Sequence, residues 1–191
     1  MGSMQIVRRD KACNVGSAAH TARHPVRDAL RRNNPQLSRV TLHLNAIPKI
    51  EHTMTAFNEL GLSAKLIQNI AAKGYDTPSP IQAKAIPLVL SGRDLMAAAQ
   101  TGTGKTAAFT LPALHMLKGG PRPSPKDVSC VILTPTRELA AQIADNIRTY
   151  GAGIKLHSQM VCGGVNIRPQ IRHLARGTDI LVATPGRLLD L

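Results

Sequence analysis

The chain has 191 residues, of which 43% are hydrophobic, and its formal net charge is +13. This length and apolar content predict one domain with an aliphatic core, and the charge favours a polyanionic partner such as nucleic acid, although a basic protein need not bind one. The sequence has no apolar run of membrane-spanning length, no secretory signal pattern at its start and no metal or redox spacing among its three cysteines. These features argue against a membrane protein and a disulfide scaffold, so we expect a cytoplasmic protein with reduced thiols.

Residues 1–53 differ in character from the rest of the chain. They hold nine Lys and Arg residues against three acidic ones, with no aromatic residue and no sustained periodicity. They are consistent with a disordered basic extension, with an Arg-rich organellar presequence, or with an incorrectly assigned start that precedes a true start at Met54. We favour the incorrectly assigned start and expect the folded domain to span residues 54–191.

Two helices are predicted at the beginning of this domain. Ser63 can cap the first helix and Gly74 can end it, with three apolar residues on one face between them. A turn at residues 76–80 leads into the second helix, over residues 81–90, which Pro87 should kink or shorten.

A phosphate-binding loop is predicted next, with Ala99 where the pattern usually has its first glycine. The loop consists of Ala99, Gln100, Thr101, Gly102, Thr103, Gly104, Lys105 and Thr106. Gly102 and Gly104 permit backbone angles that turn successive N–H groups towards an anion. Lys105 supplies a charge for the outer phosphates of a nucleoside triphosphate and Thr106 a hydroxyl for Mg²⁺, while the following helix adds the positive end of its dipole.

Strands alternate with helices from residue 94 onwards. The predicted strands are residues 94–98, 130–133, 156–162 and 179–183, and the predicted helices run from the loop to about 118, from 134 to about 150 and from 167 to 176. This alternation predicts an α/β fold with a parallel sheet that helices cover on both faces. The loops that follow the four strands then share one edge, and all four combine small residues with Lys, Arg or Thr. Such an edge suits a phosphate chain in one part and a nucleic-acid backbone in another.

Five segments, in this order, resemble the motifs of the N-terminal RecA-like domain of DEAD-box ATP-dependent RNA helicases, in particular the bacterial members. They are the Q motif at residues 74–82, the P-loop at 99–106, the PTRELA motif at 135–140, the glycine pair at 163–164 and the TPGR motif at 184–187. The resemblance covers residues 54–191 and implies a RecA-like P-loop domain that is incomplete at its C-terminal end.

The resemblance implies that the nucleotide is ATP. The residues that it assigns to ATP are Phe57, Tyr75, Thr77, Gln82 and the eight loop residues from Ala99 to Thr106, with Thr106 also a ligand of the Mg²⁺ that accompanies ATP. The Gln82 amide can donate to and accept from adenine, and Phe57 would stack on the base. The alternatives are a core position for Phe57 and a solvated helix position for Gln82.

The resemblance implies RNA as the partner, bound through sugar and phosphate. The residues that it assigns to RNA are Pro135, Thr136, Arg137, Gly163, Gly164, Thr184, Pro185, Gly186 and Arg187. Backbone contacts carry no base sequence, so we expect non-specific, salt-sensitive binding. A surface ion pair is the alternative for Arg137 and for Arg187.

The sequence contains no complete set of catalytic residues. The family's Asp-Glu-Ala-Asp and Ser-Ala-Thr motifs are absent, whereas hydrolysis in this class needs acids for Mg²⁺ and water, and in the family an arginine from a second RecA-like domain. We therefore expect a truncated gene product, weakened by the loss of an inner strand, that cannot unwind RNA by itself.

Two alternative functions stay open. A P-loop kinase or GTPase would need an acceptor site or a guanine-reading motif, and neither is visible in the sequence. A non-catalytic RNA-binding remnant would use the basic loops and the basic extension without turning over ATP.

Overall fold

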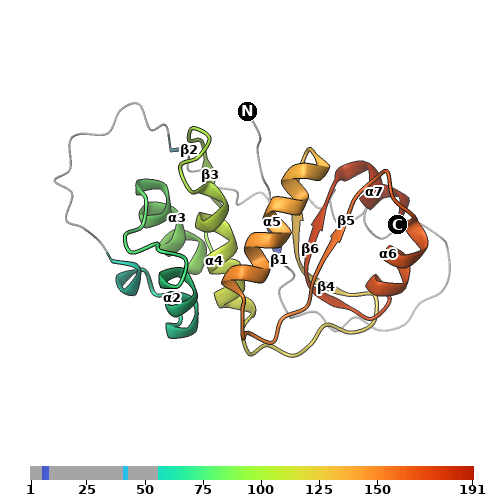
Figure 1. Ribbon diagram of the computed structural model, residues 1–191, viewed down its shortest axis with the longest axis horizontal. Coiled ribbons are helices and arrows are strands. Elements are labelled where there is room, and N and C mark those ends of the chain that lie inside the picture. Colours follow the sequence, from blue (N-terminus) through green and yellow to red (C-terminus); the bar gives the residue numbers. More distant parts are fainter. Residues whose placement is uncertain (1–5, 9–40, 43–55) are drawn as a thin grey trace.

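Two short apolar runs form the centre of the fold, in strands β4 (Val128–Leu133) and β6 (Thr178–Ala183). They pair in parallel, and β6 pairs in parallel on its other side with β5 (Ser158–Val161). Strand β1 (Ile6–Arg8) pairs with the remaining edge of β4 in the antiparallel direction. The sheet therefore has the order β1-β4-β6-β5, with three parallel strands (Figure 1).

The computed structural model describes residues 6–8, 41–42 and 56–191. Between residues 56 and 191, the helices are η1 (Phe57–Leu60), α2 (Ala64–Ala71), α3 (Pro80–Leu90), α4 (Lys105–Leu117), α5 (Arg137–Tyr150), α6 (Ile167–Leu174) and α7 (Pro185–Asp190).

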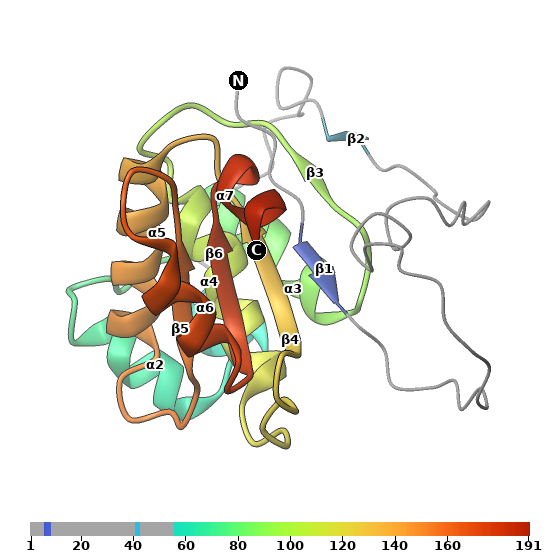
Figure 2. The ribbon, with the colours of Figure 1, turned by 90° about the vertical axis from the view of Figure 1, so that its right-hand side faces the viewer.

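Side chains of β6 alternate between two cores on opposite faces of the sheet. Ile180 and Val182 belong to the larger core, together with residues of α4 and α5. Leu181 and Ala183 belong to a smaller core, against which residues of α6 and α7 pack. All six residues of β6 are buried, because helices cover the sheet on both faces (Figure 2). The predicted α/β fold with a doubly covered parallel sheet is confirmed.

Helix α3 begins as the sequence predicts, with Pro80 at its first position and Ser79 before it. The helix continues through Pro87 to Leu90, so the expectation that Pro87 shortens it is wrong. An internal proline removes one helical hydrogen bond and crowds the carbonyl four residues before it, but the buried side chains of Ala85 and Ile86 hold this turn in the core.

The strand predicted at residues 94–98 is wrong in its length and in its partner. Only β3 (Met96–Ala97) is extended, and it pairs in parallel with β2 (Thr41–Leu42), outside the four-stranded sheet. Met96 is 53% exposed, which is unlike a residue of an inner strand. The free edge of β4 is already paired with β1, so β3 has no neighbour in the main sheet.

Strands β1 and β2 are the only described parts of residues 1–53. The expectations of a disordered extension, a presequence or an incorrect start concern residues that lie outside the described ones. Within the part of the chain that the structure describes, no helix is both long enough and apolar enough to cross a membrane.

Asn69 on α2 fastens the first helices to the rest of the domain. Its side-chain amide donates to the carbonyl of Tyr150 at 2.7 Å and to that of Ala152 at 2.8 Å, at the C-terminal end of α5. One side chain therefore satisfies two carbonyls that the end of a helix leaves without an intrahelical donor.

Replacing Asn69 with alanine should lower the free energy of unfolding by about 1–3 kcal/mol, because both carbonyls lose their donor. Gln68→Ala, at the exposed neighbouring position, is the control and should change stability by less than about 0.5 kcal/mol. Urea unfolding followed by circular dichroism measures both variants. Equal stability of the two variants would contradict this role of Asn69.

Candidate functional site

The loop between β3 and α4 has the backbone conformation that its glycines predict. Gly102 and Gly104 have φ angles of 80° and 85°, and Gly104 is the N-cap of α4. The positive φ favours glycine at residue 104, and a Cβ atom there would lie 2.3 Å from Nε2 of Gln82, so the Gln82 amide would have to shift. The loop lies at the upper end of the molecule in both views, as does α7 (Figures 1 and 2).

Lys105 is turned back onto its own loop. Its ammonium group donates to the carbonyl oxygens of Ala99 and Gln100, and the Thr103 hydroxyl donates to the same Gln100 oxygen at 2.9 Å. No carboxylate pairs with Lys105 among the described residues. A phosphate that binds in this loop therefore has to replace two carbonyl acceptors, but it does not have to break an ion pair.

Gln82 joins the start of α3 to this loop. Its Nε2 donates to the Gly104 carbonyl at 3.2 Å, and its Oε1 accepts from the backbone N–H of Ser79 at 2.9 Å. The Ser79 hydroxyl adds a bond to the Thr103 carbonyl at 2.8 Å. Gln82 is 8% exposed, which rules out the solvated helix position. Both ends of its amide are occupied, so binding to adenine requires at least one of these bonds to exchange.

Phe57, Thr77 and Tyr75, the other three residues assigned to the base, have no side-chain hydrogen bond to the loop among the described residues. Phe57 is 5% exposed and lies in the larger core, so its ring would have to leave the core to stack on a base. Thr77 is exposed in the turn before α3. Tyr75 is 53% exposed and lies near Tyr150. Burial, and then the Tyr75 phenol, raise the pKa of Tyr150.

The loops after β4 and β5 come together at one edge of the sheet. Thr136 is the N-cap of α5, where its hydroxyl accepts from the N–H of Leu139 at 3.2 Å. The next residue, Arg137, is exposed, and a Cβ atom built on Gly164 would lie 3.4 Å from its Nη1. In the described part of the chain Arg137 has no ion pair, so the ion-pair alternative does not hold for it there.

Arg187 fixes the loop after β6 to the same edge. Its Nη1 and Nη2 both lie 3.1 Å from the Val165 carbonyl, to which they donate, and its Nε lies 3.6 Å from Oδ2 of Asp190. The side chain is only 11% exposed, and Nε has no hydrogen-bond partner. In this structure Arg187 therefore positions the glycine-pair loop through Val165, and it also forms an ion pair, which was the alternative to an RNA contact. Pro185 and Gly186, which precede it, are exposed.

Gln170 is a site residue that the sequence analysis missed. Its Oε1 accepts from the N–H of Cys162 at 3.2 Å, and its Nε2 donates to the carbonyls of Cys162 at 3.3 Å and Asn166 at 3.2 Å. These bonds bridge the loop between β5 and α6 that contains the glycine pair. The available signal was a glutamine on the apolar face of α6, in register with Ile167 and Leu174.

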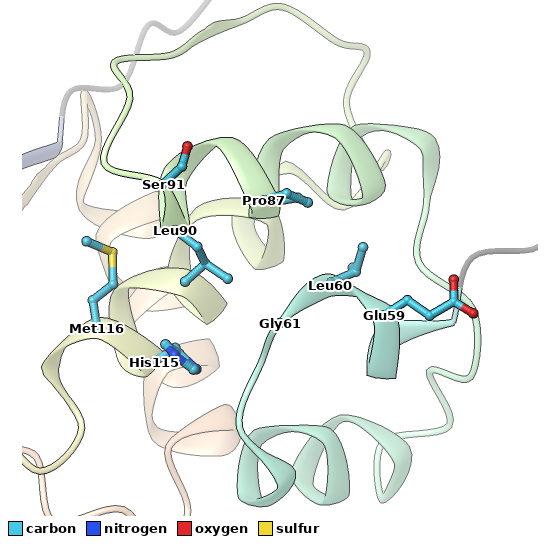
Figure 3. A pocket seen from close by; sticks show the side chains of 8 residues that line it. All are labelled: Glu59, Leu60, Gly61, Pro87, Leu90, Ser91, His115 and Met116. Atoms are coloured by element: carbon cyan, nitrogen blue, oxygen red, sulfur yellow. The ribbon is translucent and has the colours of Figure 1, made fainter.

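A pocket with a volume of about 640 Å³ lies between η1, α3 and α4 (Figure 3). It is lined by Glu59, Leu60, Gly61, Pro87, Leu90, Ser91, His115 and Met116. Nδ1 of His115 is buried there without a hydrogen-bond partner. None of the residues that the sequence analysis assigns to ATP or RNA lines this pocket.

Neither a metal cluster nor a reactive thiol is visible in the described residues. They contain no group of three His, Cys, Asp or Glu side chains that could hold a metal ion. Cys130 and Cys162 are buried and free, and burial raises the pKa of the Cys130 thiol to about 11, so it stays protonated at neutral pH.

Comparison with known proteins gives one consistent result. Residues 79–191 match the DEAD/DEAH box helicase family. The chain is 44% identical over 135 residues to the DEAD-box ATP-dependent RNA helicase RhpA of Helicobacter pylori, and 49% identical over 142 residues to the RNA helicase CrhR of a Synechocystis species. These matches cover 71% and 73% of this chain but 26% and 28% of the relatives, so the chain spans about a quarter of their length.

Solved structures agree with these relatives. A DEAD box protein from Methanococcus jannaschii superposes with a TM-score of 0.63 at 40% identity, covering 71% of this chain and 36% of that one. The RNA helicase Prp28 from Chaetomium thermophilum, bound to ADP, also superposes with a TM-score of 0.63, at 39% identity, covering 75% of this chain and 35% of that one.

Replacing Gln170 with leucine should free the glycine-pair loop and leave the sheet intact. The N–H of Cys162 loses its acceptor, so its hydrogen exchange should become at least about tenfold faster, while the amides of β6 keep their protection. Gln159→Leu, on β5 itself, is the control. Exchange at Cys162 that stays as slow as in the unchanged protein would contradict the role given to Gln170.

Proposed function

Because the chain belongs to the DEAD/DEAH box helicase family, we propose that it forms the ATP- and RNA-binding face of the first RecA-like domain of an ATP-dependent RNA helicase. The observation that carries this proposal is the pair of hydrogen bonds that join the start of α3 to the P-loop, from Gln82 to the Gly104 carbonyl and from Ser79 to the Thr103 carbonyl. They place an amide suited to adenine directly beside a loop suited to phosphates.

The P-loop fits a triphosphate with its Mg²⁺. Gly102 and Gly104 have the left-handed backbone angles that turn loop N–H groups towards an anion. Among the described residues, the ammonium group of Lys105 is held by carbonyl oxygens that phosphate oxygens can replace. Thr106, in the first turn of α4, offers its hydroxyl to Mg²⁺. Mg²⁺, when bound, neutralises phosphate charge.

Gln82 and Thr77 are proposed to make and to position the contact with the base. Gln82 exchanges its bond to Gly104 for the edge of adenine, and Thr77 shapes the turn that aims it. Tyr75 precedes the same turn and is exposed, whereas Phe57 lies on η1 and contributes to base binding only if its ring leaves the larger core.

RNA is proposed to lie along the edge formed by three loops. Arg137 supplies an exposed cation, and Gly163 and Gly164 supply exposed backbone N–H groups. Thr136 and Thr184 add hydroxyls beside them, while Arg187 holds the loop in place through Val165. Contacts of this kind bind the RNA backbone irrespective of base sequence.

We propose that this chain alone binds both ligands without turning over ATP. Hydrolysis needs carboxylates that hold Mg²⁺ and orient water, and in the described part of the chain no Asp or Glu contacts Lys105 or Thr106. Turnover by a longer protein would then draw those groups, and an arginine, from outside this face.

Replacing Lys105 with alanine should weaken Mg²⁺–ATP binding by about 100-fold or more, because the outer phosphates lose a direct cation. Lys118→Ala, at the exposed end of α4, is the matched control and should leave the affinity unchanged. Titration of a fluorescent ATP analogue measures both. Equal affinities for the two variants would place the triphosphate elsewhere.

Single-stranded RNA should bind with the same affinity whatever its base sequence, and Arg137→Gln should weaken binding. Each lost phosphate contact should reduce the slope of log affinity against log salt by about 0.7. Fluorescence anisotropy at several salt concentrations measures this. ATP turnover stimulated by RNA would contradict the inactivity proposed for this chain, and salt-dependent RNA binding without turnover would support it.

A further inference from the structure

Helix α6 presents an unbroken row of positive charge on its solvent side. Gln170 is buried and Leu174 packs against the smaller core, so this side of α6 faces the sheet. Arg168, Arg172 and Arg176 recur every fourth residue, on and just after α6, and all three are exposed. At 100° per residue they lie on the side of the helix opposite Gln170 and Leu174. We call these three residues the α6 arginine row.

Among the described residues, no carboxylate neutralises this row. Helix α6 contains no acidic residue, and within the described chain no carboxylate forms an ion pair with any of its arginines. Arg148 on α5 shows the contrast, since it pairs with Asp145. Three unpaired arginines on one side of a short helix repel each other unless a polyanion lies over them.

The row continues directly from the loop that we assign to RNA. Arg168 is the second residue of α6, which follows the loop that contains Gly163 and Gly164. Gln170 and Arg187 hold that loop in place. Figure 1 shows α6 on the outer side of the sheet, away from α4 and α5, and Figure 2 shows no other helix in front of it.

The spacing of the row suits one nucleic-acid strand. Residues four apart on an α-helix are separated by about 6 Å along its axis, which is on the scale of the distance between neighbouring phosphates of a single strand. Arginine binds phosphate oxygens through a planar fork of N–H donors. Three such residues in line can therefore follow a sugar-phosphate backbone without reading its bases.

We propose that the α6 arginine row is a second RNA-backbone surface, which extends the RNA site beyond the glycine-pair loop and holds longer strands. This inference rests on the proposed RNA site at the loops. The row should add nothing to a strand that fits the loops alone, and it should add affinity once the strand is long enough to reach along α6.

The test compares oligouridylates of 6 and 20 nucleotides by fluorescence anisotropy on the full chain. Arg168→Gln/Arg172→Gln/Arg176→Gln should weaken binding of the 20-mer by about tenfold or more at low salt and lower its salt slope by about 2, because three phosphate contacts are lost. Binding of the 6-mer should not change. The control, Lys73→Gln/Lys118→Gln/Lys155→Gln, removes the same charge at three exposed positions after α2, α4 and α5 and should leave both affinities nearly unchanged.

Each outcome decides between the two proposals. If both triple variants weaken the 20-mer equally, the effect is net charge and the row is not a surface for RNA. If the 6-mer binds and the arginine variant leaves the 20-mer unaffected, the row is overturned and the loop site stands. If the 6-mer does not bind, or Arg137→Gln leaves its affinity unchanged, the loop site itself is wrong. Equal loss of affinity for a length-matched polyphosphate would make the row a general polyanion surface and overturn its assignment to RNA.

Discussion

The hydrogen bond from the Gln82 amide to the Gly104 carbonyl joins the two segments that we propose to select the nucleotide. A P-loop by itself binds any triphosphate, because its N–H groups and its lysine recognise only phosphate. Selection for a base needs a second segment at a fixed distance from the loop. We propose that the start of α3 is that segment in this protein, since Ser79 and Gln82 are hydrogen-bonded to the loop itself.

Side-chain hydrogen bonds also fix the loops at the edge of the sheet. β6 is buried between its neighbours, so the loops that follow β4, β5 and β6 end close together. Side-chain bonds then fix these loops, through Gln170 at one end and Arg187 at the other. In the described residues these polar side chains fix the backbone of the loops, and we propose that this backbone and the exposed Arg137 bind the ligand.

The sequence predicts the features that depend on local chemistry. The alternation of apolar runs and helices predicts the sheet, and Ser79 and Pro80 predict the start of α3. The glycine at position 104 predicts the positive φ angle found there. Features that depend on distant partners were not predictable. β3 pairs outside the main sheet because the edge of β4 is already taken, which no local pattern records.

Side-chain orientation is a second feature that the sequence does not predict. The sequence signal of an aromatic residue such as Phe57 is the same whether its ring packs in the core or is exposed for stacking on a base. In this structure the ring packs in the core. Arg187 carries a charge that suggests a phosphate, yet tertiary contacts turn it onto the carbonyl of Val165. In both cases the orientation of the side chain depends on contacts with residues that are distant in the sequence.

The central claim is that the P-loop and Gln82 act as one nucleotide site. The side-chain amide signal of Gln82, observed by NMR during titration with Mg²⁺–ATP and separately with Mg²⁺–GTP, tests it most directly. We predict a large shift with ATP, as the amide exchanges the Gly104 carbonyl for adenine, and a much smaller one with GTP. A Gln82 signal that stays unchanged while the amides of Gly102 and Gly104 shift on saturation with ATP would contradict the claim.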